Sequence, residues 1–303
     1  MAQLLNPFTR PGRWYRGVFH CHSTNSDGAR SVESVITWYA EQGYEVVAIT
    51  DHNQVTPVRP PRGGRILVIP GTEVDVGRTR LGEAYHLVGI GLGEMIELPR
   101  DVASRQALPA QDVIGALRRA GAVVFVAHPY WSGLVVDGLL PLEGIAGIEV
   151  FNTNTEVDIG KGYSGVHWDD CLCRGKLLLG VANDDAHWRM PDHGRAWTML
   201  RAEKLTREAV LEALGAGAFY ASTGAVLEDV AFDGAVVTVR VGAAGASEVR
   251  FICDRRWGHR VVAEGAPLTQ ATFALRGRER YVRVEVTTPA GHHAWTNPLF
   301  LER

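Results

Sequence analysis

Short apolar runs rich in β-branched residues alternate with longer amphipathic segments between about residues 17 and 217. Seven of these runs are continuous enough to predict strands that are covered on both faces. They lie at 17–19, 45–50, 65–70, 85–91, 122–127, 147–151 and 176–182. Because helical segments separate many of the runs, the pattern predicts repeated βα units and an α/β fold rather than a meander.

Three helices are predicted from apolar residues that recur on one face. The first begins after Ser31, a good N-cap residue, and stops at Gly43. A second helix is expected to start at Pro109 and a third at Thr206. Each has the length of a segment that can cover one face of the predicted sheet.

The pattern changes after about Thr223, where helical periodicity disappears. Alternating segments at 235–241, 248–254, 271–277 and 280–288 are divided by Gly, Asp and Pro, as is typical of antiparallel strands. We therefore expect two domains, at 1–224 and 225–303, with the junction between Val226 and Val230. No long linker separates them, so the small β-sandwich-like domain should pack directly on the first.

Composition narrows the classes of function. With 303 residues, 46% of them hydrophobic, the chain can bury a large core. Its 31 basic and 34 acidic residues give a net charge of -3, which provides no field to hold duplex nucleic acid but is compatible with a small anionic substrate. The oligomeric state is left open by these properties.

Cysteine usage and the apolar stretches indicate in which cellular compartment the protein is expected. The four cysteines show neither a disulfide framework nor a zinc-finger spacing, which favours a reducing cytoplasm. The first residues have no apolar stretch of the signal-peptide type, and no run approaches the roughly 20 apolar residues that cross a bilayer. Neither export nor membrane insertion is expected.

Ligand-type side chains stand at the carboxyl ends of the predicted strands. His20 and His22 point to the same side because side chains alternate along a strand, and Asp27 lies in the loop that follows. Later strand ends carry Asp51, His52, Glu73, His128, Asp184, Asp185 and His187. In parallel βα architectures these ends converge on one rim. One such histidine is usually structural, but so many buried titratable groups would disfavour folding unless cations paired them.

The order and spacing of these motifs resemble the polymerase and histidinol phosphatase (PHP) superfamily. The motifs are His-x-His at 20–22, Ser-Asp-Gly at 26–28, Thr-Asp-His at 50–52, Gly-Thr-Glu at 71–73, Ala-His-Pro at 127–129 and Asp-x-His at 185–187. The resemblance covers about residues 17–217 and implies a distorted seven-stranded βα barrel. The β segment, with GAFYASTG before it and AWTNPLFL at its end, further resembles the CehA/McbA-like branch.

The resemblance also implies a set of metal ligands. One ion would be held by His20, His22 and Asp185, a second by His86 and His128 with Glu73 bridging the two, and a third by Asp27, His52 and His187. We therefore expect two or three divalent ions, and the mixed N/O ligand set suits Mn, Zn or Fe without choosing among them. His86 fits least well, because it lies inside a predicted strand and not at its end.

The implied activity is hydrolysis of a small phosphate monoester or diester, such as a nucleotide or an oligonucleotide end. A hydroxide that bridges two ions would attack phosphorus, and Glu73, His128, Asp185 and His187 would be the catalytic residues. Two alternatives stay open: hydrolysis of carboxylic or carbamate esters, and a non-catalytic, metal-binding regulatory module. Asp51 and Asp184 are expected to orient ligand imidazoles from outside the ligand shell.

Weaker signals surround the expected site. Arg195 could bind phosphate with two hydrogen bonds, or be an exposed loop arginine. Asn152 and Asn154 could bind substrate or form a turn. Lys161 belongs to a glycine-rich segment, 158–168, that is either a mobile loop over the pocket or an ordinary surface loop. The segment 129–131, Pro-Tyr-Trp, could form an aromatic wall or pack in the core.

Overall fold

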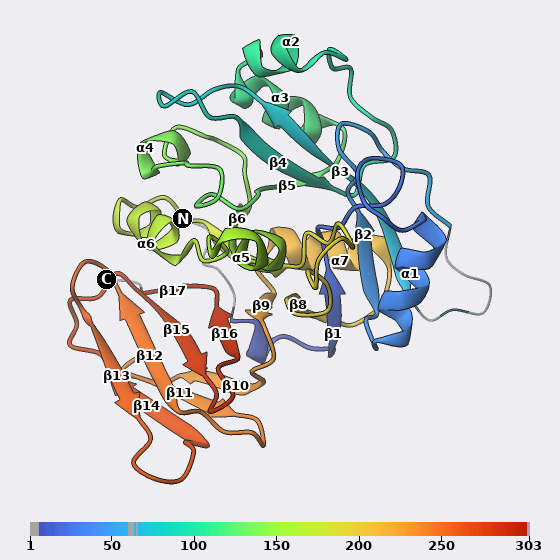
Figure 1. Ribbon diagram of the computed structural model, residues 1–303. Coiled ribbons are helices and arrows are strands. Elements are labelled where there is room, and N and C mark those ends of the chain that lie inside the picture. The colour runs from blue at the N-terminus through green and yellow to red at the C-terminus, as the bar shows by residue number, and fades with distance from the viewer. Residues whose placement is uncertain (1–5, 60–63, 65, 302–303) are drawn as a thin grey trace.

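A computed structural model describes residues 6–59, 64 and 66–301, and shows an α/β part followed by a β part (Figure 1). Seven strands of the α/β part are neighbours in the sheet in chain order. They are β1 (Arg13–Val18), β2 (Val46–Ile49), β3 (Leu67–Val76), β4 (Tyr85–Ile90), β5 (Val123–Val126), β6 (Gly147–Asn152) and β7 (Leu179–Asn183). The predicted α/β fold is confirmed. Of the predicted strand at 65–70, Arg65 lies outside the described residues.

The direction of β4 departs from the predicted repeat of βα units. β1, β2 and β3 are parallel, as are β5, β6 and β7, but β4 is antiparallel to both of its neighbours. The connection at 77–84 is too short for a helical crossover, so β3 and β4 form a hairpin. As a result, the amino end of β4 lies beside the carboxyl ends of the parallel strands.

The first and seventh strands meet just beyond their carboxyl ends. The backbone N–H of Asp185 donates to the carbonyl of His20 at 2.9 Å, and that of His22 donates to the carbonyl of Ala186 at 3.0 Å. On the side away from β2, β1 pairs with the antiparallel strand β8 (Trp197–Ala202), and β8 pairs in turn with β9 (Phe219–Ser222); the pattern predicted neither strand. The two hydrogen bonds between the ends of β1 and β7 bring the first motif, at 20–22, next to the last motif, at 185–187.

The three predicted helices are present as α1 (Val32–Glu41), α3 (Ala110–Arg119) and α7 (Arg207–Gly215). Ser31 and Thr206 cap α1 and α7 by accepting backbone N–H bonds, while Pro109 precedes α3 without a side-chain cap. Shorter elements that were not predicted are η1 (Pro7–Thr9), α2 (Val102–Ala107), α4 (Val136–Leu139), α5 (Thr153–Ile159) and α6 (Gly165–Cys173). Among the described residues, no helix has the length and apolar character needed to span a bilayer.

The segment 158–168 is neither a mobile loop nor an ordinary surface loop. It contains the end of α5, a connection at 160–164 and the start of α6. Trp168 is fully buried, and its indole N–H donates to the carbonyl of Leu178 at 2.8 Å. The packing of this indole fixes α6 against the sheet.

The residues after Thr223 form two facing sheets. One consists of β10 (Leu227–Phe232), β11 (Val236–Val241) and β14 (Gln270–Ala274). The other contains β12 (Glu248–Cys253), β13 (Gly258–Val262), β15 (Tyr281–Thr287), β16 (His293–Thr296) and β17 (Leu299–Phe300). The core between them includes Val239, Phe251 and Val284. Because β16 pairs with β9, the second sheet continues into the α/β part (Figure 1).

A buried arginine ties the two parts together. Arg283 on β15 donates two bonds of 2.7 Å to Asp169 on α6 and one of 2.6 Å to Glu285, and its guanidinium lies over the ring of Trp168. Burial alone lowers the pKa of Arg283, but the two carboxylates raise it above its ordinary value. The guanidinium is therefore held in its charged form.

Replacing Arg283 with methionine is expected to lower the free energy of unfolding by about 3 kcal/mol, because two carboxylates lose their buried partner. Chemical denaturation followed by circular dichroism measures this change. Arg240→Met, which removes an exposed ion pair with Asp229, is the control and should cost less than about 1 kcal/mol. Equal losses in the two variants would contradict the stabilising role of the buried cluster.

Candidate metal centre

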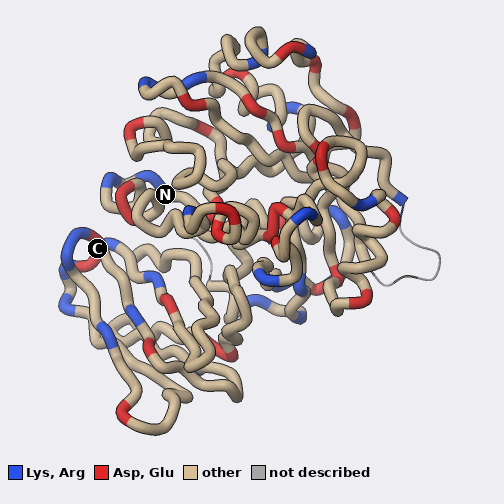
Figure 2. The backbone as a smooth tube through the Cα atoms, viewed as in Figure 1, with Lys and Arg blue, Asp and Glu red and all other residues tan. Residues whose placement is uncertain are grey.

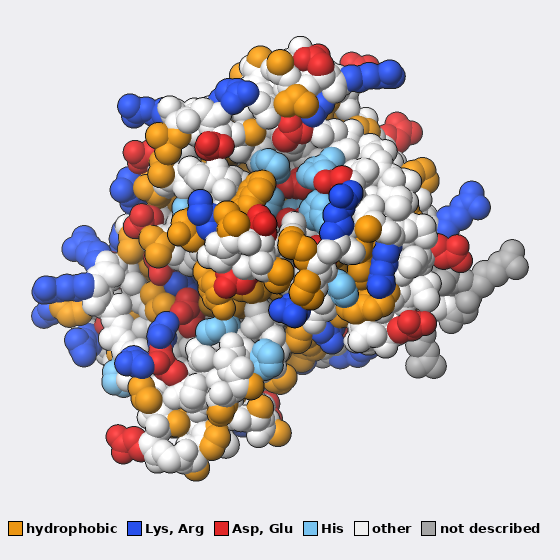
Figure 3. Space-filling view, viewed as in Figure 1, with side chains coloured by type: hydrophobic (Ala, Val, Ile, Leu, Met, Phe, Trp, Pro, Cys, Tyr) orange, Lys and Arg blue, Asp and Glu red, His pale blue; other side chains and the backbone are white. Residues whose placement is uncertain are grey.

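The structure brings together all nine residues of the ligand set that the resemblance implied. Figure 3 shows histidine and acidic side chains at the bottom of a hollow in the surface. Their nitrogen and oxygen atoms form three groups, each with ligand atoms within 4.8 Å of one another. The groups are His20, His22, Glu73 and Asp185; Glu73, His86 and His128; and His22, Asp27, His52 and His187. They match the three expected sets, with His22 added to the third.

Glu73 lies at the centre of this arrangement. Its carboxylate is buried, and each oxygen faces a different set of imidazoles. Oε1 lies 2.8 Å from His86 Nδ1 and 3.1 Å from His128 Nε2, while Oε2 lies 3.1 Å from His20 Nε2 and 3.2 Å from both His22 Nε2 and His52 Nδ1. This geometry suits a carboxylate that bridges two cations.

The first group has a donor set that fits a cation. The Nε2 atoms of His20 and His22 are 3.2 Å apart, and His22 Nε2 lies 2.9 Å from Asp185 Oδ1, all in the buried interior. His20 Nδ1 already bonds to another carboxylate, that of Glu149, at 2.8 Å. Converging imidazole lone pairs and carboxylate oxygens are the ligands that divalent transition metals take.

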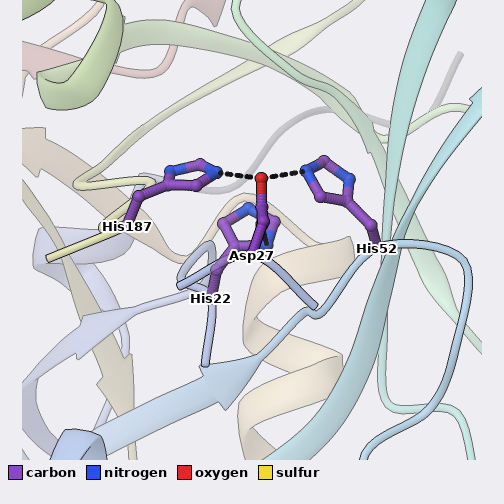
Figure 4. A group of neighbouring side chains, drawn as sticks. All are labelled: His22, Asp27, His52 and His187. Atoms are coloured by element: carbon purple, nitrogen blue, oxygen red, sulfur yellow. Dashed lines mark ion pairs between the residues drawn. The ribbon is translucent and has the colours of Figure 1, made fainter. Parts of the chain in front are cut away.

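The third group, drawn in Figure 4, contains the fewest buried residues of the three. Asp27 Oδ2 lies 3.3 Å from His187 Nε2 and 3.7 Å from His52 Nε2, and the Asp27 side chain is 49% exposed. His22 turns its Nδ1 toward Asp27 at 3.8 Å, while its Nε2 faces the first group. A cation in this group would therefore be the one nearest to solvent.

The direction of β4 explains how His86 joins the second group. In the register of the β3–β4 hairpin His86 pairs with Asp75, close to Glu73 and at the start of its strand. Because the strand is antiparallel, its amino end points to the rim where the parallel strands end. The mismatch noted for His86 in the sequence follows from assuming a parallel strand.

Two residues of the centre have a strained backbone. His128 has φ +27° and Asp185 has φ +55°, in a region that residues other than glycine rarely adopt. His128 is held there by its turn, in which its Nδ1 lies 2.9 Å from Ser132 Oγ and its Nε2 faces Glu73. Such strain is found where the side chain direction matters for function.

Electrostatics at the centre favour positive charge. Burial alone lowers the pKa of His22, but its hydrogen bonds with Asp185 and Glu73 raise it to about 9. Burial also opposes ionisation of Glu73, yet the neighbouring His20 and His52 hold the pKa of this carboxyl well below its ordinary value. Ionised carboxylates in a buried site need cations beside them, and divalent metals would provide these.

Sequence reasoning missed the buried carboxylate that orients the ligands. Glu149 on β6 lies 2.8 Å from His20 Nδ1 through Oε1, and its Oε2 accepts the backbone N–H of His128 at 2.9 Å. Oε2 also accepts from Asn152 Nδ2 at 2.8 Å, and Oε1 from Asn183 Nδ2 at 3.0 Å. The only signal was one charged residue inside the apolar run 147–151.

Asp51 and Asp184, which were expected to orient imidazoles, have other partners, and that expectation is wrong. Asp51 accepts hydrogen bonds from the hydroxyls of Ser23, Ser26 and Thr56 and from the backbone of Ser23. Asp184 accepts from the backbone N–H groups of 194–196 and from the hydroxyls of Tyr39 and Thr153. Both carboxylates shape the loops that carry the ligands.

Asn152 and Asn154 lie within the centre and not at its opening. Asn152 is buried, its Nδ2 donates to Glu149 and Asp185, and its Oδ1 caps α5 by accepting the backbone N–H of Thr155. These bonds engage both the amide nitrogen and the amide oxygen, which supports a structural role for Asn152, and a substrate contact stays a prediction. The Asn154 amide lies 3.0 Å from Nδ1 of the His187 ring.

Three cationic side chains lie on the loops around the centre. Arg195 is exposed, with its backbone N–H bound to Asp184. Lys161 has its ammonium 5.3 Å from the ring centroid of Tyr130. Arg189, which the sequence reasoning passed over, donates to the backbone carbonyl of Asp27 at 2.9 Å. It follows His187 by two residues, which is the signal that could have identified it.

Comparison with solved structures bears on the fold. A two-domain protein from Bacteroides vulgatus, containing a predicted PHP-like metal-dependent phosphoesterase, matches 99% of this chain over 100% of its own, with a TM-score of 0.54 and 18% identity. The chain therefore shares the overall fold of this two-domain protein. An amidohydrolase from Chromobacterium violaceum covers 56% of this chain and 87% of its own, with a TM-score of 0.41 and 18% identity.

Sequence comparison gives a shorter match. No family model matches the chain. A phosphoribosyl 1,2-cyclic phosphate 1,2-diphosphodiesterase from Eggerthella lenta is 34% identical over 79 residues, which is 25% of this chain and 30% of the relative. The chain thus spans under a third of the length of this curated relative. The likeness to the Bacteroides structure extends over both parts of the chain, whereas the CehA/McbA-like resemblance stays a prediction.

Proposed function

We propose that this chain is a metal-dependent phosphoesterase, a hydrolase of small phosphate monoesters or diesters. The observation that carries the proposal is the clustering of nine ligand-type residues in three groups around Glu73. The names of the Bacteroides and Eggerthella proteins, a predicted phosphoesterase and a phosphodiesterase, support the same chemistry. We further propose that β1–β7 form the distorted seven-stranded barrel of this fold and that a second domain starts near residue 225.

The three groups would hold two or three divalent ions, for which Mn, Zn and Fe are the candidates. When bound, such ions lower the pKa of a coordinated water and neutralise charge that develops on a phosphoryl group. The chain's own residues prepare the site: Glu149 orients His20, and Glu73 spans the groups. Arg189 adds positive charge beside Asp27, where an anionic ester would enter.

Charge supports a small substrate as the partner. Acidic and basic residues occur in both parts of the chain (Figure 2), and the net charge is -3. A duplex nucleic acid would need a basic surface, and a membrane surface would need basic or apolar patches. We therefore propose a small anionic ester as the substrate, and the cytoplasm as the compartment.

The proposal is tested by assaying a panel of esters with the purified protein. After chelation, Mn, Zn or Fe(II) is added back, and phosphomonoesters, phosphodiesters, carboxylic esters and carbamates are supplied. We expect metal-dependent release of phosphate or of a phosphomonoester. Turnover of carboxylic or carbamate esters alone would overturn the proposal, and absence of metal-dependent turnover would favour a regulatory module.

The third group predicts a measurable change in metal content. Asp27→Asn removes the single carboxylate of that group, so the protein should bind one ion fewer per chain while the other groups stay loaded. Elemental analysis after dialysis against metal-free buffer measures the ratio. Asp112→Asn, at an exposed position on α3, is the control. An unchanged ratio in Asp27→Asn would show that the third group holds no ion.

A further inference from the structure

Two exposed aromatic residues stand directly beside the second ligand group. Trp131 is 38% exposed and Tyr130 is 44% exposed, although large aromatic side chains are usually well buried. The Trp131 ring centroid lies 5.0 Å from that of His128 and 6.0 Å from that of His86. Figure 3 shows hydrophobic side chains at the border of the hollow that contains the histidines.

The chain holds these aromatic residues in place. They lie in the turn after His128, which is closed by a bond from Ser132 N–H to the carbonyl of His128 and by a hydrogen bond between His128 Nδ1 and Ser132 Oγ. The backbone N–H of Tyr130 donates to Ser164 Oγ at 3.1 Å, which anchors the turn to the start of α6. The turn is therefore built into the site and is not a free surface loop.

The Trp131 side chain is partly open to solvent, and neither neighbouring imidazole is stacked on its ring. It meets both imidazoles nearly at right angles, at 86° to His86 and 80° to His128, so these contacts are edge contacts and not stacks. A planar group can then stack on the indole face, and stacking of this kind accepts any base because every base has a π-face. A phosphate bound at the neighbouring donors would bring its attached alcohol to this ring.

We propose that Trp131 is the specificity-determining residue of the site, and that the preferred substrate is a phosphate ester whose alcohol carries a planar aromatic ring, such as a nucleobase. This inference rests on the proposed phosphoesterase function. Lys161, whose ammonium lies near the Tyr130 ring, supplies a positive charge on the same side for a second polar group of the alcohol. The sequence left open whether 129–131 forms a wall or core, and the exposure of both rings favours the wall.

The test uses two substrates that differ only in the base. Adenosine 5'-monophosphate and ribose 5-phosphate have the same phosphoester bond and the same leaving hydroxyl. We expect the metal-loaded protein to have a higher kcat/KM for the nucleotide, and Trp131→Ala to reduce that preference by about 10-fold through KM, as loss of one stacked base does. Trp131→Phe should keep most of the preference. Phe232→Ala, at an exposed aromatic of β10, is the matched control and should leave it unchanged.

Binding of adenosine, measured by titration calorimetry, tests stacking on Trp131 separately from the proposed phosphoesterase function. If no phosphoester is hydrolysed, the proposed function fails, and adenosine binding that is weakened by Trp131→Ala would still support the stacking surface. The inference is overturned if the unchanged protein hydrolyses both substrates equally well. It is also overturned if Trp131→Ala slows both substrates alike and lowers the metal content, because Trp131 would then only support His86 and His128. Should Trp131→Ala fail to fold, Trp131→Phe and the substrate pair decide the question.

Discussion

Replacing Glu73 with glutamine is expected to lower kcat/KM for any phosphoester by more than about 100-fold. Loss of a residue outside the ligand shell costs up to about 100-fold, and loss of a bridging ligand should cost more. Glu73 contacts imidazoles of all three ligand groups through its two oxygens, so the neutral amide weakens every group at once. Glutamine keeps the shape of the side chain, and the fold should survive. Steady-state kinetics with added metal, together with elemental analysis, measures both effects.

Glu94→Gln provides the control for this variant, because Glu94 is exposed and lies in the connection after β4. It should behave as the unchanged protein does. A Glu73→Gln protein with full metal content and near-normal rates would show that Glu73 does not bridge the groups, and the centre would then have to be assigned again from the other ligands.

Glu149→Gln should reduce metal affinity or activity by about 10- to 100-fold, although Glu149 belongs to none of the three ligand groups. Its carboxylate fixes the ring of His20 and the backbone of His128, which lie in different groups. With a neutral amide, His20 loses the partner that sets which ring nitrogen is free. Metal titration by calorimetry and kinetics at saturating metal measure the two contributions.

Glu143→Gln is the matched control for Glu149, since the Glu143 side chain is exposed and forms an ion pair with the Lys176 ammonium at 3.5 Å, away from the three ligand groups. A positioning role for Glu149 predicts that high metal concentration restores part of the lost activity. If the variant binds metal normally and remains slow at every metal concentration, Glu149 acts on the reaction in another way.

Strand-end positions indicated most of the candidate ligands and the family resemblance implied the full set, including His86, but neither indicated the residues that support the ligands. His20 and His22 could be placed on one face because strand side chains alternate, and the remaining motifs follow because parallel strand ends share a rim. Glu149 escaped because its partner His20 lies 129 positions earlier in the chain, and only the closed arrangement of strands brings the two together. An isolated charge in an apolar run gives no hint of its partner.

Chain direction was the other feature that periodicity could not provide. The run at 85–91 has the same apolar pattern whether the strand is parallel or antiparallel, and the short connection at 77–84 decides between them. The capping role of Asn152 escaped prediction for a related reason. Its position at a strand end suggested a substrate contact. It also precedes α5, where its side-chain amide oxygen accepts a hydrogen bond from one of the free backbone N–H groups of the first turn.

The pairing of β16 with β9 makes the two parts of the chain depend on each other during folding. Thr223, just after β9, accepts a bond from the backbone of His293, which comes 70 positions later. Until β16 arrives, β9 is an open edge, and open edges pair with other chains. We therefore expect chains cut after residue 224 to aggregate rather than fold as a free unit, and the intact protein to unfold in a single cooperative transition.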